Sequence, residues 1–181
     1  MEVIRIIDRN NHLLSVRYGD AEETEFSKIF TFWNDTEALF SFFSDNAADL
    51  KTLTIQEAVL EVIDAAAYLE DRILDNAESG LVDFLQEFKP LHLNPDSSQK
   101  YILNKLYGPS KRIPLRLYGI RLRDDAKGDT IIVTGGAIKL TRAMQDRPHT
   151  KLELDKLDQV MRYLRHQNFS SDEIEFLELE L

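Results

Sequence analysis

The chain has 181 residues, of which 43% are hydrophobic and 30% charged, and its formal net charge is -10. This length and apolar content predict one folded domain over residues 1–181 and exclude a largely disordered chain. The sequence has no cysteine, which excludes disulfides, thiolate metal sites and a cysteine nucleophile. No apolar run approaches the ~20 residues of a membrane-spanning helix, and the N-terminus shows no secretory signal. We therefore expect a cytoplasmic protein without membrane contact.

The charge is unevenly distributed along the chain. Residues 1–99 hold 7 basic and 20 acidic side chains, and residues 152–181 hold 3 basic and 8 acidic ones. Residues 100–151, in contrast, hold 12 basic and 4 acidic side chains. The net charge excludes a uniformly basic nucleic-acid binder, but it leaves this central segment as a candidate for local contact with an anionic partner.

The first predicted elements are a hairpin and aromatic helices. Residues 2–7 and 12–18 are apolar or alternating, and the turn sequence of residues 8–11 separates them, which predicts a β-hairpin. Aromatic residues then recur at helical spacing in residues 26–33 and again in residues 39–43. These aromatic side chains are most simply part of the core, and a groove for a partner is the alternative.

The clearest helix is predicted over about residues 54–78. Thr54 and Glu57 form a capping-box pattern at its start, and a continuous apolar stripe follows. A second apolar helical pattern covers residues 81–88 and ends before Pro90.

The periodicity changes in the basic segment. Residues 99–107 fit either a short helix or a strand. Residues 114–123 alternate strictly, and residues 130–134 are rich in β-branched side chains, so both predict strands. Gly135 and Gly136 interrupt this pattern, and residues 137–141 are predicted to form a third strand.

An amphipathic helix is predicted after Pro148. The order of elements predicts an α+β fold, in which an N-terminal hairpin and helices pack on a small antiparallel sheet with a C-terminal helix. Within the single domain, residues 1–99 form the acidic hairpin and helical part. Residues 100–181 form the basic sheet and the C-terminal helices.

The basic segment also contains the candidate functional side chains. Cations at one edge of a sheet would bind a phosphodiester and stabilise a pentacovalent transition state, and Tyr118 or His149 could transfer protons. Paired glycines would let a phosphate approach the backbone closely. The candidate catalytic residues are Arg116, Tyr118, Arg121, Lys139 and Arg142, and the candidate RNA-binding residues are Arg123, Gly135, Gly136, Arg147 and His149.

Part of this segment resembles a known family. Residues 136–141, followed by Pro148 and by Glu153 and Leu154 in a helix, resemble the C-terminal signature of the RelE/ParE toxin superfamily, and its HigB-like branch most. Residues 115–121 resemble the central strand of that family. Residues 134–145 are also similar to a group of proteins common in Bacteroidetes. The match covers about residues 112–166.

The resemblance implies a RelE-like α+β fold and the toxin component of a type II toxin–antitoxin system. It implies metal-independent cleavage of mRNA at the ribosome, in which the 2′-hydroxyl of the substrate is the nucleophile and no metal or other cofactor takes part. It also implies a helix-turn-helix antitoxin as the partner. The histidines of the chain show no close metal-ligand spacing, which agrees with the expectation of no metal site.

Other interpretations remain open at this point. The chain could be a non-catalytic interaction protein that binds a protein or RNA partner through the basic sheet edge. The basic side chains could instead be paired with the acidic helices of the same chain. Gly135 and Gly136 could form a bulge or tight turn, and His149 could be an ordinary surface residue. Acidic side chains such as Glu153 are most simply a solvated helix face.

Overall fold

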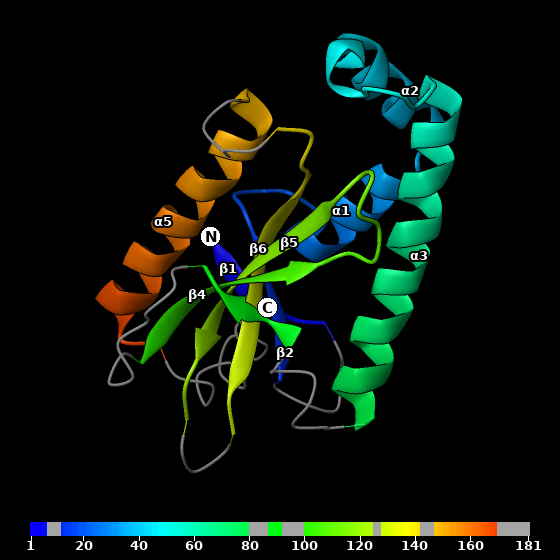
Figure 1. Cartoon of the computed structure of the whole chain (residues 1–181). Coiled ribbons are helices and arrows are strands. Elements are labelled where there is room, and N and C mark those ends of the chain that lie inside the picture. Colours follow the sequence, from blue (N-terminus) through cyan, green and yellow to red (C-terminus); the bar gives the residue numbers. More distant parts are fainter. Residues whose placement is uncertain (7–11, 80–86, 92–99, 125–127, 142–146, 170–181) are drawn as a thin grey trace.

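The computed structural model shows a six-stranded sheet with helices on both faces (Figure 1). It describes residues 1–6, 12–79, 87–91, 100–124, 128–141 and 147–169. The predicted α+β class is confirmed. The described strands are β1 (Glu2–Arg5), β2 (Leu13–Arg17), β3 (Lys89–Pro90), β4 (Tyr101–Tyr107), β5 (Leu115–Leu122) and β6 (Thr130–Ile138). The described helices are α1 (Glu25–Asn34), α2 (Thr36–Asp45), the short 3-10 helix η1 (Ala47–Asp49), α3 (Ile55–Ser79) and α5 (Pro148–Gln167).

The order of strands in the sheet is β1-β2-β6-β5-β4-β3. As predicted, β1 and β2 form an antiparallel hairpin, and β5 pairs antiparallel with β6. Strand β5 also pairs antiparallel with β4. The hairpin joins the rest of the sheet differently, because β2 runs parallel to β6 from Leu13 opposite Ile131 to Ser15 opposite Val133. The sheet is therefore mixed, and not purely antiparallel as the sequence predicts, because β2 and β6 are parallel.

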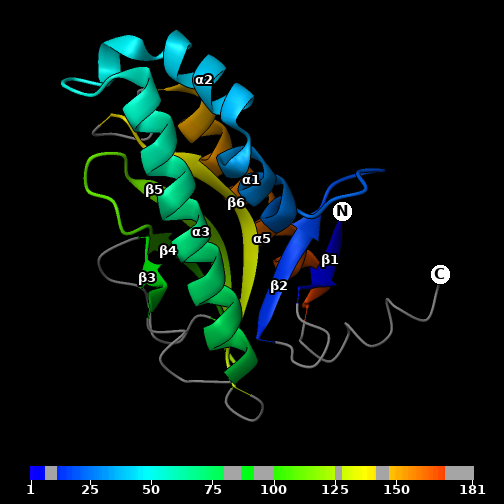
Figure 2. The same ribbon diagram turned by 90° about the vertical axis from the view of Figure 1, so that its right-hand side faces the viewer.

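The sheet separates two apolar cores. Helices α1 and α3 lie on one face and α5 on the other, as two views at right angles show (Figures 1 and 2). Strand β5 contributes to both cores, because alternate side chains point to opposite faces. Leu115 and Leu117 lie in the core beneath α1 and α3, whereas Ile120 and Leu122 lie in the core beneath α5.

The predicted helix boundaries depend on local caps that the structure contains. The Thr54 hydroxyl accepts a hydrogen bond from the Glu57 N–H at 3.2 Å, and Glu57 accepts one from the Thr54 N–H at 2.8 Å. This reciprocal capping box confirms the predicted start of α3. Helix α5 begins at Pro148, where a missing N–H costs no helical hydrogen bond. The predicted helix over residues 81–88 lies mostly outside the described residues.

Strand β6 does not end at the glycine pair. It continues to Ile138, so the prediction of a separate third strand over residues 137–141 is wrong. The pairing with β5 shifts there, since Gly135 lies opposite Tyr118 and Val133 opposite Gly119. Thr134 is thus the extra residue of a β-bulge, which is the alternative that the glycine pair left open.

Candidate nucleic-acid interface

The four predicted catalytic residues that the structure describes do not meet at one point of the sheet. Arg116 and Tyr118 share the face on which α5 packs, as their spacing predicts. Arg121 points to the opposite face, where its cross-strand neighbour Ile131 belongs to the core beneath α1 and α3. Lys139 follows the end of β6, and Arg142 lies outside the described residues.

Arg121 is held in the hairpin between β5 and β6. Its Nε donates to Asp129 Oδ2 at 2.5 Å, and the other oxygen of that carboxylate accepts the N–H of Asp124 at 3.2 Å. The guanidinium group therefore has a carboxylate partner within the same hairpin. This arrangement stabilises the turn and leaves Arg121 less available to a phosphate.

Tyr118 lies beneath the surface and not on it. Its side chain is only 1% exposed, and burial raises the pKa of its hydroxyl well above the usual value, with Glu153 adding to the effect. A phenol in such surroundings keeps its proton at neutral pH. Its position fits packing beneath α5 better than proton exchange with a bound substrate.

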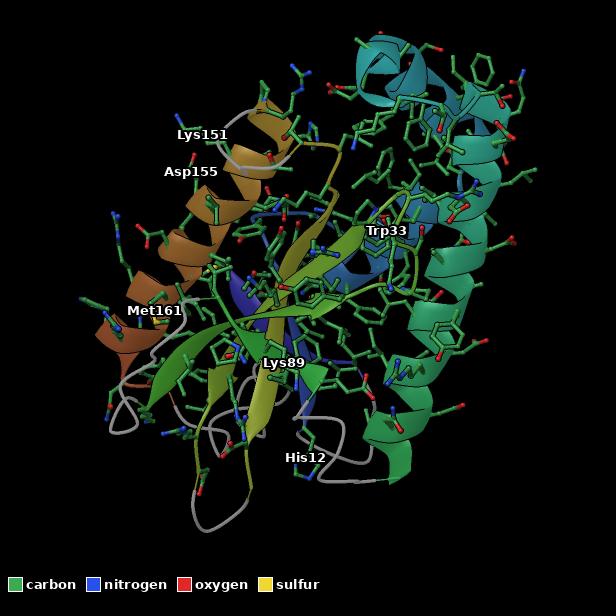
Figure 3. All side chains as sticks on the ribbon, viewed as in Figure 1. His12, Trp33, Lys89, Lys151, Asp155 and Met161 are labelled. Carbon is green, nitrogen blue, oxygen red and sulfur yellow. The ribbon has the colours of Figure 1, made fainter. Side chains whose placement is uncertain are left out.

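The strand ends around Arg116 form a basic and aromatic surface. Lys89 lies opposite Lys105, and Tyr107 lies opposite Arg116, so all four side chains share one face across β3, β4 and β5. We call these four residues the cationic sheet face. Lys89 and Tyr107 are exposed, while Lys105 and Arg116 are partly buried. Lys89 marks the edge of this surface (Figure 3).

Tyr107 organises the cations of this face. The guanidinium carbon of Arg116 lies 4.0 Å from the centre of the Tyr107 ring, and Lys105 Nζ lies 5.6 Å from it. Both distances are within the range of cation–π attraction. Partial burial lowers the pKa of Arg116, but a guanidinium group stays charged at physiological pH. Lys89, Lys105 and Arg116 form no ion pair with any described residue.

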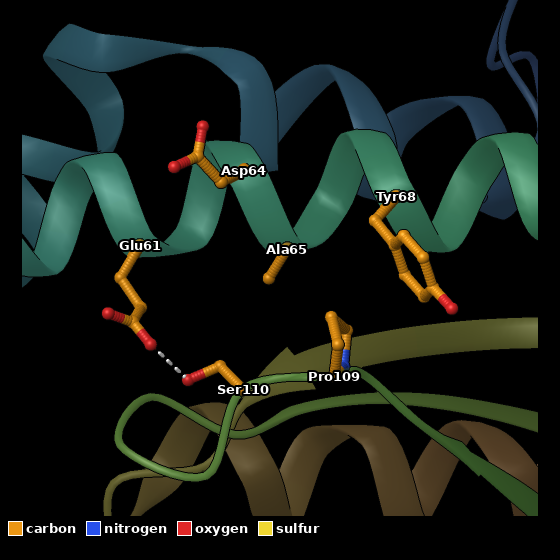
Figure 4. Close-up of a pocket in the computed structure, with 6 residues that line it drawn as sticks. All are labelled: Glu61, Asp64, Ala65, Tyr68, Pro109 and Ser110. Atoms are coloured by element: carbon orange, nitrogen blue, oxygen red, sulfur yellow. Dashed lines mark hydrogen bonds between the residues drawn. The ribbon is translucent and has the colours of Figure 1, made fainter.

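Two other arginines of the basic segment are neutralised by the acidic helical part. Arg112 pairs with Glu61 of α3, and Arg147 pairs with Asp49 of η1. Figure 4 shows that Glu61 also accepts a hydrogen bond from Ser110, at 2.6 Å. For these two arginines, pairing with acidic residues of the same chain is confirmed. Arg112 and Arg147 thus differ from Lys105 and Arg116, which form no ion pair with a described residue.

His149 and Lys139 lie where β6 meets α5. His149 Nε2 donates to the carbonyl oxygen of Ile138 at 3.1 Å. The His149 ring also lies edge-on to the Phe42 ring, with 5.1 Å between the two ring centres. The backbone N–H of Lys139 donates to the carbonyl of Pro114 at 2.8 Å, which extends the pairing of β5 and β6. Arg123 follows β5, and its N–H donates to the carbonyl of Lys100 at 2.9 Å.

The glycine pair is packed against the chain itself. A Cβ at Gly135 would collide with the Glu153 carboxylate, and a Cβ at Gly136 would lie 3.0 Å from Ile29 and 3.1 Å from Trp33. Both glycines are buried. The close approach that the sequence predicts is therefore made by α5 and α1, which fill the space that a phosphate would need.

A buried ion network lies beside this bulge. Lys156 Nζ is 2.7 Å from Glu25 Oε2 and 2.8 Å from Glu153 Oε1, and Lys28 pairs with the other oxygen of Glu25 at 3.3 Å. Glu25 is 4% exposed and Glu153 is 5% exposed. The interpretation of Glu153 as part of a solvated helix face is therefore wrong. Position 153 shares the helical stripe of Leu157, Val160 and Leu164, which is a signal the sequence contains.

Burial sets the protonation of this network. It raises the pKa of Glu153 despite the opposing hydrogen bond from Lys156. Burial acts to lower the pKa of Lys156, but the hydrogen bonds to Glu153 and Glu25 outweigh it, so that pKa is raised. Glu153 Oε2 and the hydroxyl of Tyr18 are buried without a hydrogen-bond partner among the described residues. Burial and the two carboxylates raise the pKa of Tyr18.

A groove lies on the other side of the molecule, between α3 and residues 109–110. It has a volume of about 410 Å³, and Ala65, Tyr68 and Pro109 line it together with Glu61 (Figure 4). The Asp64 carboxylate points away from it.

Within the described ranges, no set of three or more histidine and acidic side chains is placed to hold a metal ion. No described helix is long and apolar enough to cross a membrane.

Comparisons of the chain with protein-family models, curated proteins and solved structures returned no match. Lys89, Lys105 and Tyr107 were not among the predicted site residues. In a strand over residues 101–107, Lys105 and Tyr107 share one face, but only the pairing of β3, β4 and β5 joins them to Arg116.

Proposed function

We propose that the protein binds RNA through the cationic sheet face. The observation that carries this proposal is a group of three cations that have no acidic partner among the described residues: Lys105 and Arg116 lie against one exposed aromatic ring, and Lys89 lies opposite Lys105. Cations that neutralise phosphates provide most of the sequence-independent affinity for nucleic acids, and exposed aromatic rings or guanidinium planes stack with unpaired bases.

An RNA partner fits this face better than an acidic protein. Tyr107 is 43% exposed and carries a cation against its ring, which provides a flat surface beside two phosphate-binding groups. Sheets that bind RNA combine the same two kinds of side chain. A strongly salt-dependent affinity distinguishes this mode from an apolar protein interface, whose affinity changes little with salt.

The second candidate is toxin-like, ribosome-associated cleavage of mRNA without a metal, with an antitoxin as the neutralising partner. The observation that favours it is Arg116, a charged group on the open face that could stabilise a phosphorane-like transition state. The 2′-hydroxyl of the substrate would attack the adjacent phosphorus and give its proton to water, forming a 2′,3′-cyclic phosphate, while the bond to the 5′-oxygen breaks and that oxygen leaves with a proton. A buried Tyr118 does not supply that proton, so water would have to do so.

One set of variants tests both candidates. We expect a labelled 12-nucleotide single-stranded RNA to bind the wild-type protein at low salt, and Lys105→Ala and Arg116→Ala to weaken binding. Each change should reduce the salt slope of log K by about 0.7, the contribution of one phosphate contact to a single strand. Lys151→Ala, which removes an exposed cation of α5, is the matched control (Figure 3).

Growth and RNA integrity separate binding from cleavage. Expression of a cleaving toxin should arrest bacterial growth and shorten mRNA, and Arg116→Ala should relieve both effects. Intact RNA and normal growth, combined with salt-dependent binding, support a non-catalytic RNA-binding protein. Absence of RNA binding at low salt contradicts the proposal.

A further inference from the structure

Asp49, which belongs to the acidic helical part, forms an ion pair with Arg147, the residue directly before α5. Arg147 Nε donates to Asp49 Oδ2 at 2.9 Å, and its Nη2 lies 2.7 Å from Oδ1 and 2.6 Å from Oδ2. This two-pronged geometry is the one in which a guanidinium group holds a phosphate. Asp49 therefore occupies the donors of Arg147 that an RNA phosphate would use.

Arg147 lies at the same end of the sheet as Arg116. Arg116 is the cross-strand partner of Ala137, and the next residue, Ile138, accepts the hydrogen bond of His149. Arg147 directly precedes α5, two residues before His149. The first turn of α5 thus follows the same end of the sheet, one strand beyond Arg116. A cation released at this point would lengthen the basic surface in the direction of β6.

The contact that holds Arg147 involves a small corner of the molecule. Asp49 lies in η1, directly after α2, and α2 packs mainly on α1 and α3 (Figure 1). Among the described residues, the Asp49–Arg147 ion pair and the edge-on packing of Phe42 against His149 join this corner to the start of α5. The Arg147 side chain remains 38% exposed, so a solvent-borne phosphate can reach it.

We propose that Asp49 is an intramolecular competitor of RNA, which keeps Arg147 from extending the cationic sheet face. This inference rests on the proposed RNA binding. The pair is partly exposed, so its net contribution to stability is small, and an approaching phosphate exchanges one anion for another at the same guanidinium group. RNA binding and the Asp49–Arg147 pair then exclude each other, and the pair limits the affinity of the free protein.

The test measures binding of the same labelled 12-nucleotide RNA to Asp49→Asn. We expect its affinity to exceed that of the wild type several-fold, and its salt slope to steepen by about 0.7 because one phosphate contact is added. Asp155→Asn is the matched control. It makes the same change in net charge at an exposed position of α5 that has no ion pair with a described residue (Figure 3). The gain should disappear in Asp49→Asn with Arg147→Ala.

Three results would overturn the inference. They are an equal gain in Asp155→Asn, an unchanged salt slope in Asp49→Asn, or a gain that persists without Arg147. Asp49→Ser removes the same carboxylate and repeats the measurement if Asp49→Asn fails to fold. If the wild-type protein binds RNA and Asp49→Asn binds it with the same affinity, the competition between Asp49 and RNA is contradicted, but the proposed RNA binding is not. Absence of binding by all of these proteins contradicts the proposed RNA binding itself.

Discussion

The ammonium group of Lys156 lies 2.7 Å from the carboxylate of Glu25, which joins the C-terminal helix to the first residue of α1. These two helices lie on opposite faces of the sheet (Figure 2). The described pairing of β2 with β6 ends at Ser15 and Val133, before the bulge. The ion pair therefore bridges the two layers near the point where these strands separate.

Replacing Lys156 tests this bridge. Lys156→Met leaves two buried carboxylates without their shared cation, and we expect the free energy of unfolding to fall by about 3 kcal/mol. Urea unfolding at pH 7 measures the change. Lys151→Met, at an exposed position one turn earlier, should change stability by less than about 0.5 kcal/mol. Equal effects of the two substitutions would contradict a structural role for the network.

Glu153 should make stability depend on pH. Its pKa is raised by burial, so the folded state holds this proton more tightly than the unfolded chain does. Protonated Glu153 therefore stabilises the folded state. This stabilisation is complete below the pKa that Glu153 has in the unfolded chain, and it is lost as the pH rises through the pKa of Glu153 in the folded state. Glu153→Gln cannot lose a proton, so its stability relative to the wild type should increase over that interval. The free energy of unfolding from pH 4 to pH 9 provides the comparison, and parallel curves would refute the prediction.

Gly135 should tolerate no side chain while Glu153 is present. A Cβ at this position would overlap the Glu153 carboxylate, which Lys156 holds in place. We expect Gly135→Ala to cost about 2 kcal/mol, within the range of overpacked cores. In a double-mutant cycle with Glu153→Ala, the combined loss should be smaller than the sum of the single losses. Strict additivity would show that the two positions do not interact.

Tyr101 should hold the C-terminal end of α5 on the sheet. Its buried hydroxyl lies 2.8 Å from the carbonyl oxygen of Phe169 and 3.2 Å from that of Leu164. Tyr101→Phe removes the donor and leaves both carbonyls without it, which should cost about 1–2 kcal/mol. Amide hydrogen exchange should also become faster in the last turn of α5 than in its first. Uniform exchange along the helix would argue against this anchor.

The elements whose signals are local were predicted well. The hairpin strands, the aromatic helix α1, the capped helix α3 and the strands β5 and β6 all appear near their predicted positions. Each has a periodicity or a cap within a few residues. The ambiguous pattern of residues 99–107 proved to be strand β4, because β5 and β3 pair with it on either side.

The features that depend on distant pairing were not predictable in the same way. Nothing near Leu13 indicates that β2 runs parallel to β6, and nothing near Lys89 indicates that it lies opposite Lys105. The candidate site therefore changed its membership. Arg116 shares the face of Tyr118, as their spacing predicts, and Arg121 and Arg147 have carboxylate partners. Lys105 and Tyr107 join the proposed surface through the register of β4.

The parallel junction of β2 and β6 also constrains how the chain folds. The Ser15 hydroxyl donates to the carbonyl of Val133, a residue 118 positions later. At about 5–20 residues per second, the ribosome needs on the order of ten seconds to supply that partner. During this interval the apolar side chains of the N-terminal hairpin have no sheet to join. We expect folding to be slow, with the hairpin completing its packing only after β6 has been synthesised.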